Sequence, residues 1–184
     1  MIFMVGKKGG LHYLKISFGT QKDRSPEIYD FFFTHLPAAL HDLGAGAVDL
    51  EIERLEPLDS IYTNLDKSPA EMKKIFDKFT KCHHLEKEPS LTLDNKRTSL
   101  HAQISTRNLS CVLQDYNVLF DMFFADVIVK SESLSLTIDM MDGFSNSVLV
   151  FGPEDIVGKF KTLIGKKMKN LKFKNADSRA NSRK

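Results

Sequence analysis

Apolar residues recur at helical spacing in SPEIYDFFFTHLPAALHDLG, residues 25–44. Those on one stripe are Ile28, Phe31, Phe32, His35, Leu36, Ala39, Leu40 and Leu43. Ser25 suits an N-cap, and Pro26 suits the first helical position because its missing N–H would have no partner there. Gly44 can end the helix in a left-handed conformation. Pro37 predicts a kink, since proline removes one backbone hydrogen bond.

Two further segments show the same spacing. Residues 68–79, SPAEMKKIFDKF, begin with a capping box formed by Ser68 and Glu71, and Met72, Ile75, Phe76 and Phe79 form the buried stripe. The last helix is predicted from Pro153, with a stripe that runs from Ile156 to Leu171. Acidic residues at its start and lysines near its end complement the helix dipole.

Alternation of apolar and polar residues predicts strands elsewhere. In Ala47 to Leu55, buried Val48, Leu50 and Ile52 would alternate with an acidic outer face. The other predicted strands are residues 2–5, 11–18, 91–95, 100–104, 109–113, 133–141 and 147–151. The strand predicted at residues 109–113 contains Cys111, which is expected to be a small buried residue.

The order of these elements favours an α+β fold, with a mainly antiparallel sheet and about three helices, the last C-terminal and amphipathic. Strands joined by short turns favour antiparallel pairing. Residues 118–129 are apolar enough for either a strand or a helix, and periodicity does not decide between them. We predict a single domain over residues 1–174 and a disordered basic tail over residues 175–184, where no apolar residue is larger than alanine.

Composition fits a soluble globular protein: 42% of the residues are hydrophobic, 27% are charged, and 14 are phenylalanine. No apolar run has the roughly 18 residues of a transmembrane helix. In the N-terminal sequence MIFMVGKKGG, a few apolar residues precede the lysines, whereas a signal peptide has its basic residues before a longer apolar stretch. A cytoplasmic location is therefore expected. Two cysteines are too few for a disulfide scaffold.

Motifs for bound groups are weak, and no cofactor or metal is predicted. Gly158, Gly165 and Lys167 do not have the spacing of a P-loop, and they fall inside the last predicted helix. Cys82, His83 and His84 are adjacent, whereas a structural zinc site needs two spaced pairs. The sequence contains no G-x-S-x-G elbow for a serine nucleophile.

Charge is divided along the chain, although the net charge is only +2. Residues 153–184 carry ten lysines and arginines against three acids, a net +7; the preceding residues carry 16 against 21, a net −5. The basic end is a candidate for binding nucleic acid or another anionic surface without sequence preference. Its candidate residues are Lys159, Lys166, Lys167, Lys169, Lys172, Lys174, Arg179, Arg183 and Lys184. An ordinary solvated helix end explains the same charges.

Three functional hypotheses remain. The first is a non-catalytic protein that binds another protein, of the inhibitor, immunity, adaptor or regulatory type. Its candidate surface is the acidic face formed by Asp49, Glu51, Glu53 and Glu56, which can meet a basic partner. The second is polyanion binding through the C-terminus. The third is an enzyme whose site is assembled in space, for which a deep pocket with His12, His101 or Cys111 beside a carboxylate would be needed.

Overall fold

The described strands form one sheet of nine strands, in the order β4-β5-β3-β6-β7-β8-β2-β1-β9. The computed structural model describes residues 2–8, 10–18, 26–54, 69–83, 85, 89–93, 98–120, 125–140, 147–168 and 172–173. The strands are β1 (Ile2–Lys8), β2 (Leu11–Ser17), β3 (Ala47–Arg54), β4 (Ser90–Leu93), β5 (Thr98–Ser105), β6 (Asp126–Ser131), β7 (Leu136–Met140), β8 (Ser147–Gly152) and β9 (Lys172–Phe173). All neighbouring pairs are antiparallel except β1 and β9, which are parallel.

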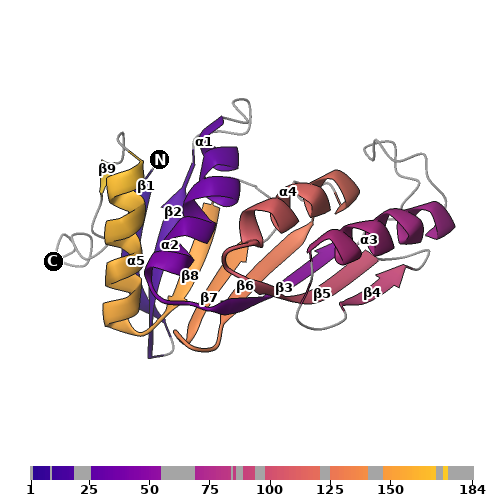
Figure 1. Ribbon diagram of the computed structural model, residues 1–184. Helices are drawn as coiled ribbons and strands as arrows, with labels where there is room; N and C mark the ends of the chain where they lie inside the picture. The colour runs from indigo at the N-terminus through magenta and orange to yellow at the C-terminus, as the bar shows by residue number, and fades with distance from the viewer. Residues whose placement is uncertain are drawn as a thin grey trace, which may run out of the picture.

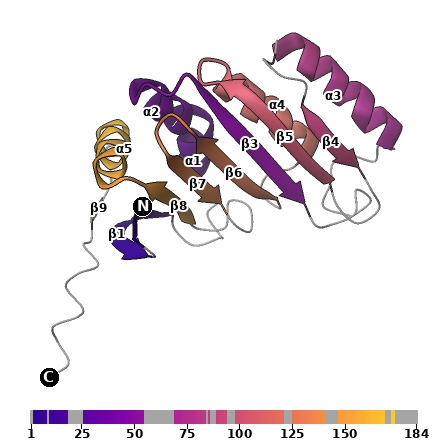
Figure 2. The ribbon, with the colours of Figure 1, turned by 90° about the horizontal axis from the view of Figure 1, so that it is seen from below.

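Every described helix lies on the same side of this sheet (Figures 1 and 2). The helices are α1 (Pro26–Tyr29), η1 (Asp30–His35), α2 (Leu36–Asp42), α3 (Pro69–His83), α4 (Leu109–Phe120) and α5 (Glu154–Lys167). The fold is therefore α+β with a mainly antiparallel sheet, as the sequence predicts, and its last helix is C-terminal.

The hydrophobic core fills the space between the sheet and the helices. Along β3, the predicted alternation is confirmed: Val48, Leu50 and Ile52 are at most 1% exposed. The same alternation of buried and half-buried residues runs along β6, β7 and β8. The helices contribute Phe31, Phe32, Leu36, Leu40, Leu109, Val112, Leu113, Tyr116, Val157, Phe160 and Ile164 to this core.

Residues 26–42 form a helix with a break in its hydrogen-bonding pattern, where the sequence predicts a kink. Asp30–His35 is a π-helix, and the Leu36 N–H donates to the carbonyl of Phe31. Pro37 follows directly and supplies no N–H. In an α-helix, the residue at position 37 would donate to the Phe33 carbonyl; here the Ser110 hydroxyl of α4 donates to that carbonyl at 2.5 Å.

The helix ends as the sequence predicts. Gly44 has a φ of +89°, a conformation that costs glycine little. Its N–H donates to the His41 carbonyl at 2.9 Å, and the Ala45 N–H donates to the Leu40 carbonyl at 3.0 Å. This pair of hydrogen bonds is a Schellman motif, which satisfies two carbonyls that the helix end would otherwise leave unpaired.

The substitution Ser110→Ala should lower the free energy of unfolding by about 1 kcal/mol, because it removes the donor to the Phe33 carbonyl. In a Pro37→Ala background, Ser110→Ala should cost at least about 0.5 kcal/mol less, since replacing the proline restores a backbone N–H that can donate to the same carbonyl. Urea unfolding of the four proteins in this double-mutant cycle measures the difference. Purely additive effects would show that Ser110 does not compensate for the proline.

One predicted strand is wrong. Residues 109–113 begin α4 instead, because Leu109, Val112, Leu113 and Tyr116 follow helical spacing and are all buried. The five-residue window also fits alternation, and only the longer segment separates the two patterns. Cys111 consequently lies on the outer side of a helix and is exposed, contrary to the expectation that it is buried in a strand.

The last helix is shorter than predicted. It ends at Lys167, and Met168 already has an extended backbone. Leu171, the last residue of the predicted stripe, lies outside the described residues. Lys172–Phe173 instead pair with Ile2 and Phe3 as β9. The ambiguous segment 118–129 is divided: its first three residues end α4, and residues 126–129 lie in β6. The predicted N-caps Ser25 and Ser68 and the tail 175–184 lie outside the described residues.

Candidate functional site

The side of the sheet opposite the helices is called the open face here, because no helix in the described part of the chain lies on it (Figure 2). The register of the strands aligns the side chains on this face in two rows that run across the sheet. The first row, from β4 to β1, is Ser90, His101, Glu51, Ile128, Asp139, Leu149, Lys15 and Met4. The second row, from β5 to β1, is Gln103, Asp49, Lys130, Thr137, Phe151, Tyr13 and Gly6.

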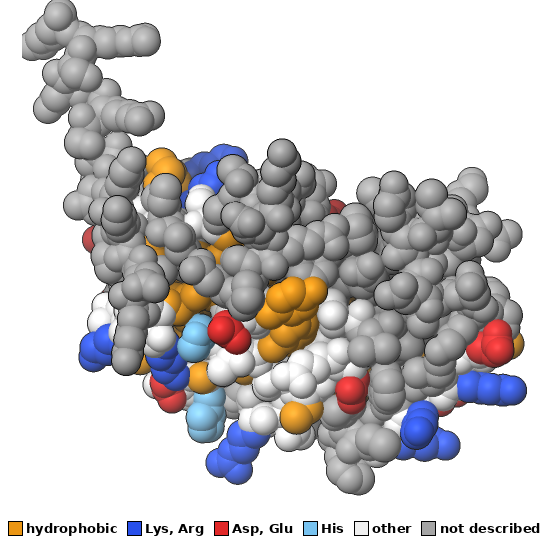
Figure 3. All heavy atoms as spheres, turned by 90° about the horizontal axis from the view of Figure 1, so that it is seen from above, with side chains coloured by type: hydrophobic (Ala, Val, Ile, Leu, Met, Phe, Trp, Pro, Cys, Tyr) orange, Lys and Arg blue, Asp and Glu red, His pale blue; other side chains and the backbone are white. Residues whose placement is uncertain are grey.

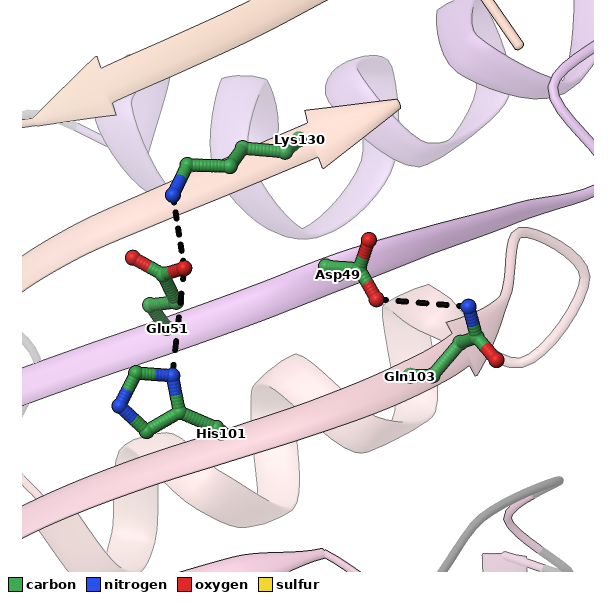
Figure 4. A network of polar contacts seen from close by, with 5 residues as sticks. All are labelled: Asp49, Glu51, His101, Gln103 and Lys130. Carbon is green, nitrogen blue, oxygen red and sulfur yellow. Dashed lines mark hydrogen bonds and ion pairs between the residues drawn. The ribbon is translucent and has the colours of Figure 1, made fainter. Parts of the chain in front are cut away.

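One end of these rows is a polar cluster formed by Asp49, Glu51, His101, Gln103 and Lys130 (Figure 4). The Glu51 side chain lies between two neighbouring strands. Its Oε1 accepts a hydrogen bond from Lys130 Nζ of β6 at 2.7 Å and lies 3.9 Å from His101 Nδ1 of β5. Asp49 lies two residues before Glu51 on β3, and its Oδ1 accepts a hydrogen bond from Gln103 Nε2 of β5 at 3.4 Å. The three strands are thus bridged on their outer side by charged and polar groups.

A hollow of about 310 Å³ opens beside this cluster, between β3 and β5. The residues that line it are Asp49, Leu50, Glu51, Ser90, His101, Ala102 and Gln103. It is open to solvent, and it lies near the lower limit of the volumes that bind small molecules. It therefore has room for one small group and lacks the enclosure of a typical enzyme active site.

Carboxylates gather along the middle of the open face. Glu53 of β3 lies opposite Asp126 of β6 in the register of the two strands. Burial, followed by the charge of Asp126, raises the pKa of Asp139. Since a raised carboxyl pKa means that the folded protein disfavours the charged form, the Asp139 charge lowers stability at neutral pH.

The other end of the rows is apolar. Tyr13 and Phe151 are neighbours across β2 and β8, with ring centroids 6.3 Å apart. The Tyr13 ring covers Gly6, where a Cβ would lie only 2.7 Å from the ring atoms. Met4 is 37% exposed, and Leu149 is half-buried between charged residues. The open face therefore combines an acidic half with an apolar, aromatic half.

The predicted acidic residues Asp49, Glu51 and Glu53 all lie on the open face, because they alternate with the buried residues of β3. Glu56 lies outside the described residues. Sequence reasoning did not single out Gln103 or Lys130, and it considered His101 only in isolation. These three come from strands adjacent to β3, so only the pairing of β5 and β6 with β3 would have brought them to the acidic residues.

Four of the nine predicted basic residues lie in the described structure. Lys159 pairs with Asp155 at 3.3 Å, Lys167 pairs with Asp42 at 3.0 Å, and Lys166 is exposed. In the view of Figure 3, the lysine and arginine side chains are spread around the described surface. Lys172 lies in β9. The remaining candidates, outside the described residues, are Lys169, Lys174, Arg179, Arg183 and Lys184.

The histidine and cysteine candidates are dispersed. His12 is on the helix side of β2, where its Nε2 lies 3.2 Å from Glu154 Oε2 at the start of α5. His101 is on the open face, and Cys111 is on α4. Within the described ranges, no group of three or more histidine, cysteine or acidic side chains is arranged to hold a metal ion.

None of the helices in the described portion combines the length and the apolar character needed to cross a membrane. Comparisons of the chain with protein-family models, with curated proteins and with solved structures gave no match.

Proposed function

We propose that this protein is a non-catalytic interaction protein that binds a basic protein partner through the open face of its sheet. The observation that carries the proposal is the composition of that face. Tyr13, Phe151 and Met4 belong to the residue types that are enriched in protein interfaces, and they are only partly buried on a sheet surface without a described helix above it. Aromatic side chains in such positions often supply much of the binding energy.

Charge supports a basic partner. The half of the open face formed by β3, β6 and β7 carries five carboxylates, from Asp49, Glu51, Glu53, Asp126 and Asp139, against the amine of Lys130 among the described residues. The amines of Lys8 and Lys15 lie at the other end of the face, on β1 and β2. The pKa of Asp139 is raised by burial and then by the charge of Asp126, so the folded protein keeps the Asp139 charge at a cost to stability. A partner with lysines and arginines opposite these carboxylates would relieve that repulsion and would be attracted over a distance.

Photo-crosslinking from two positions tests this proposal. A photoreactive amino acid at Thr137, on the open face, should give a protein adduct in extract from the source cells. The same amino acid at Thr162, on the exposed side of α5, should give none. Once the captured protein is identified and purified, its affinity should fall at least tenfold with the double variant D49N/E51Q, because two carboxylates of the interface lose their charge.

The matched control is E132Q/D155N, which removes the same formal charge from the β6–β7 turn and from α5 and should change the affinity less than twofold. An adduct from Thr162 but not Thr137 would contradict the proposal. So would equal losses of affinity in the two double variants, because that result would indicate only a general effect of net charge.

Polyanion binding through the basic end is the competing function. The exposed side chain of Lys166 supports it, whereas the ion pairs of Lys159 and Lys167 reduce the charge available on α5. Nucleic acid crosslinked from Thr162 on α5, without an adduct from Thr137, would favour this alternative over the open face.

A further inference from the structure

We infer that the hollow between β3 and β5 receives the guanidinium group of an arginine side chain from the protein partner. This inference rests on the proposed function and specifies how the partner would be recognised at one point of the open face. The described residues that line the hollow lie on three strands, β3, β4 and β5.

The charge of the site calls for a cation. Asp49 and Glu51 contribute two negative charges, and Lys130 contributes one positive charge through its 2.7 Å contact with Glu51. The formal charges of these three side chains sum to −1. The amine of Lys130 also argues against a metal ion, because it already occupies one oxygen of the nearest carboxylate and repels a second compact cation.

Unused acceptors favour arginine over lysine. Both contacts of Glu51 involve Oε1, and the contact of Asp49 involves Oδ1. Within the described part of the chain, Glu51 Oε2 and Asp49 Oδ2 therefore remain available, together with the amide oxygen of Gln103 and the hydroxyl of Ser90. Four acceptors suit the five N–H donors of a planar guanidinium better than the three of an ammonium group.

The size of the hollow agrees with a single side chain. At about 310 Å³, it is close to the smallest sites that bind free small molecules, and it is open to the solvent from which a partner would approach.

A titration of the ¹⁵N-labelled full chain with N-acetyl-arginine amide tests the inference. Saturable shifts are expected in the backbone amide signals of Ser90, His101 and Gln103. N-acetyl-citrulline amide, which has a similar shape without the charge, should produce none, and N-acetyl-lysine amide should bind at least threefold more weakly. D49N/E51Q should abolish the arginine shifts, while E132Q/D155N should retain them. The substitution Lys130→Gln should tighten arginine binding at least threefold, because it removes the competing amine.

Equal shifts with citrulline, arginine shifts that survive in D49N/E51Q, or no arginine shifts would overturn the inference. This failure is distinct from that of the proposed function. If the Thr137 adduct forms and the titration fails, the partner binds the open face without an arginine in the hollow. If the titration succeeds and the adduct does not form, the hollow binds guanidinium and the assignment to a protein partner is wrong.

Discussion

Replacing Phe160 with alanine is expected to lower the free energy of unfolding by about 3–5 kcal/mol. Phe160 is fully buried on α5, between the buried residues Val157 and Ile164. Helix α5 packs on β2 and β8 and beside α2. Removing the Phe160 ring therefore leaves a cavity among elements from both ends of the chain. Neighbouring side chains on a sheet and two helices have little freedom to fill such a cavity.

Urea unfolding monitored by circular dichroism measures this loss. The control is Lys166→Ala, on the same helix and exposed, which should change stability by no more than about 0.5 kcal/mol. A loss below about 1 kcal/mol for Phe160→Ala would mean that α5 is not anchored through this side chain.

The second large effect is a loss of stability at high pH caused by Tyr116. Burial raises the pKa of its phenol from 10.0 to about 12, and the nearby carboxylate of Asp115 acts in the same direction. Between these two values the unfolded chain releases a proton that the folded chain keeps. Stability is therefore fully present below pH 10 and falls as pH rises to 12, by about 2–3 kcal/mol from this group.

The variant Tyr116→Phe isolates this contribution from that of the lysines, which titrate in the same range. The difference in free energy of unfolding between the parent protein and the variant should shrink, or reverse in favour of the variant, as pH rises from 9.5 to 12. A constant difference for Tyr116→Phe across this range would mean that its phenol ionises equally in both states.

The fold could be predicted from the sequence wherever one periodicity ran unbroken. The acidic alternation of β3 and the stripe and glycine end of α2 are such cases. Prediction was wrong for residues 109–113, because a window of five residues satisfies both periods. It also overextended α5, because Met168 and Leu171 continue the helical spacing although the backbone at Met168 is extended. Pairing with β1 explains the strand at Lys172, and no local pattern contains that information.

The candidate site could be predicted only in part. The sequence placed Asp49, Glu51 and Glu53 on one side of a strand, because alternation is a local property. It could not place Lys130 beside Glu51, since 79 positions separate the two residues. The order of strands in a sheet is decided by packing over the whole chain and not by local sequence. A site whose residues come from neighbouring strands therefore cannot be predicted from local patterns alone.

The position of the N-terminal hairpin has a consequence for synthesis of the protein. Strand β2 pairs with β8, and Ser17 meets Ser147, 130 residues later in the chain. At ribosomal rates of about 5–20 residues per second, the hairpin of β1 and β2 is synthesised roughly 6–26 seconds before β8. During that interval the β2 edge and the apolar side chains of Leu14 and Ile16 lack the strand that borders them in the folded protein. The nascent chain thus passes through a stage in which a chaperone can hold this edge, and slower translation lengthens its exposure to aggregation.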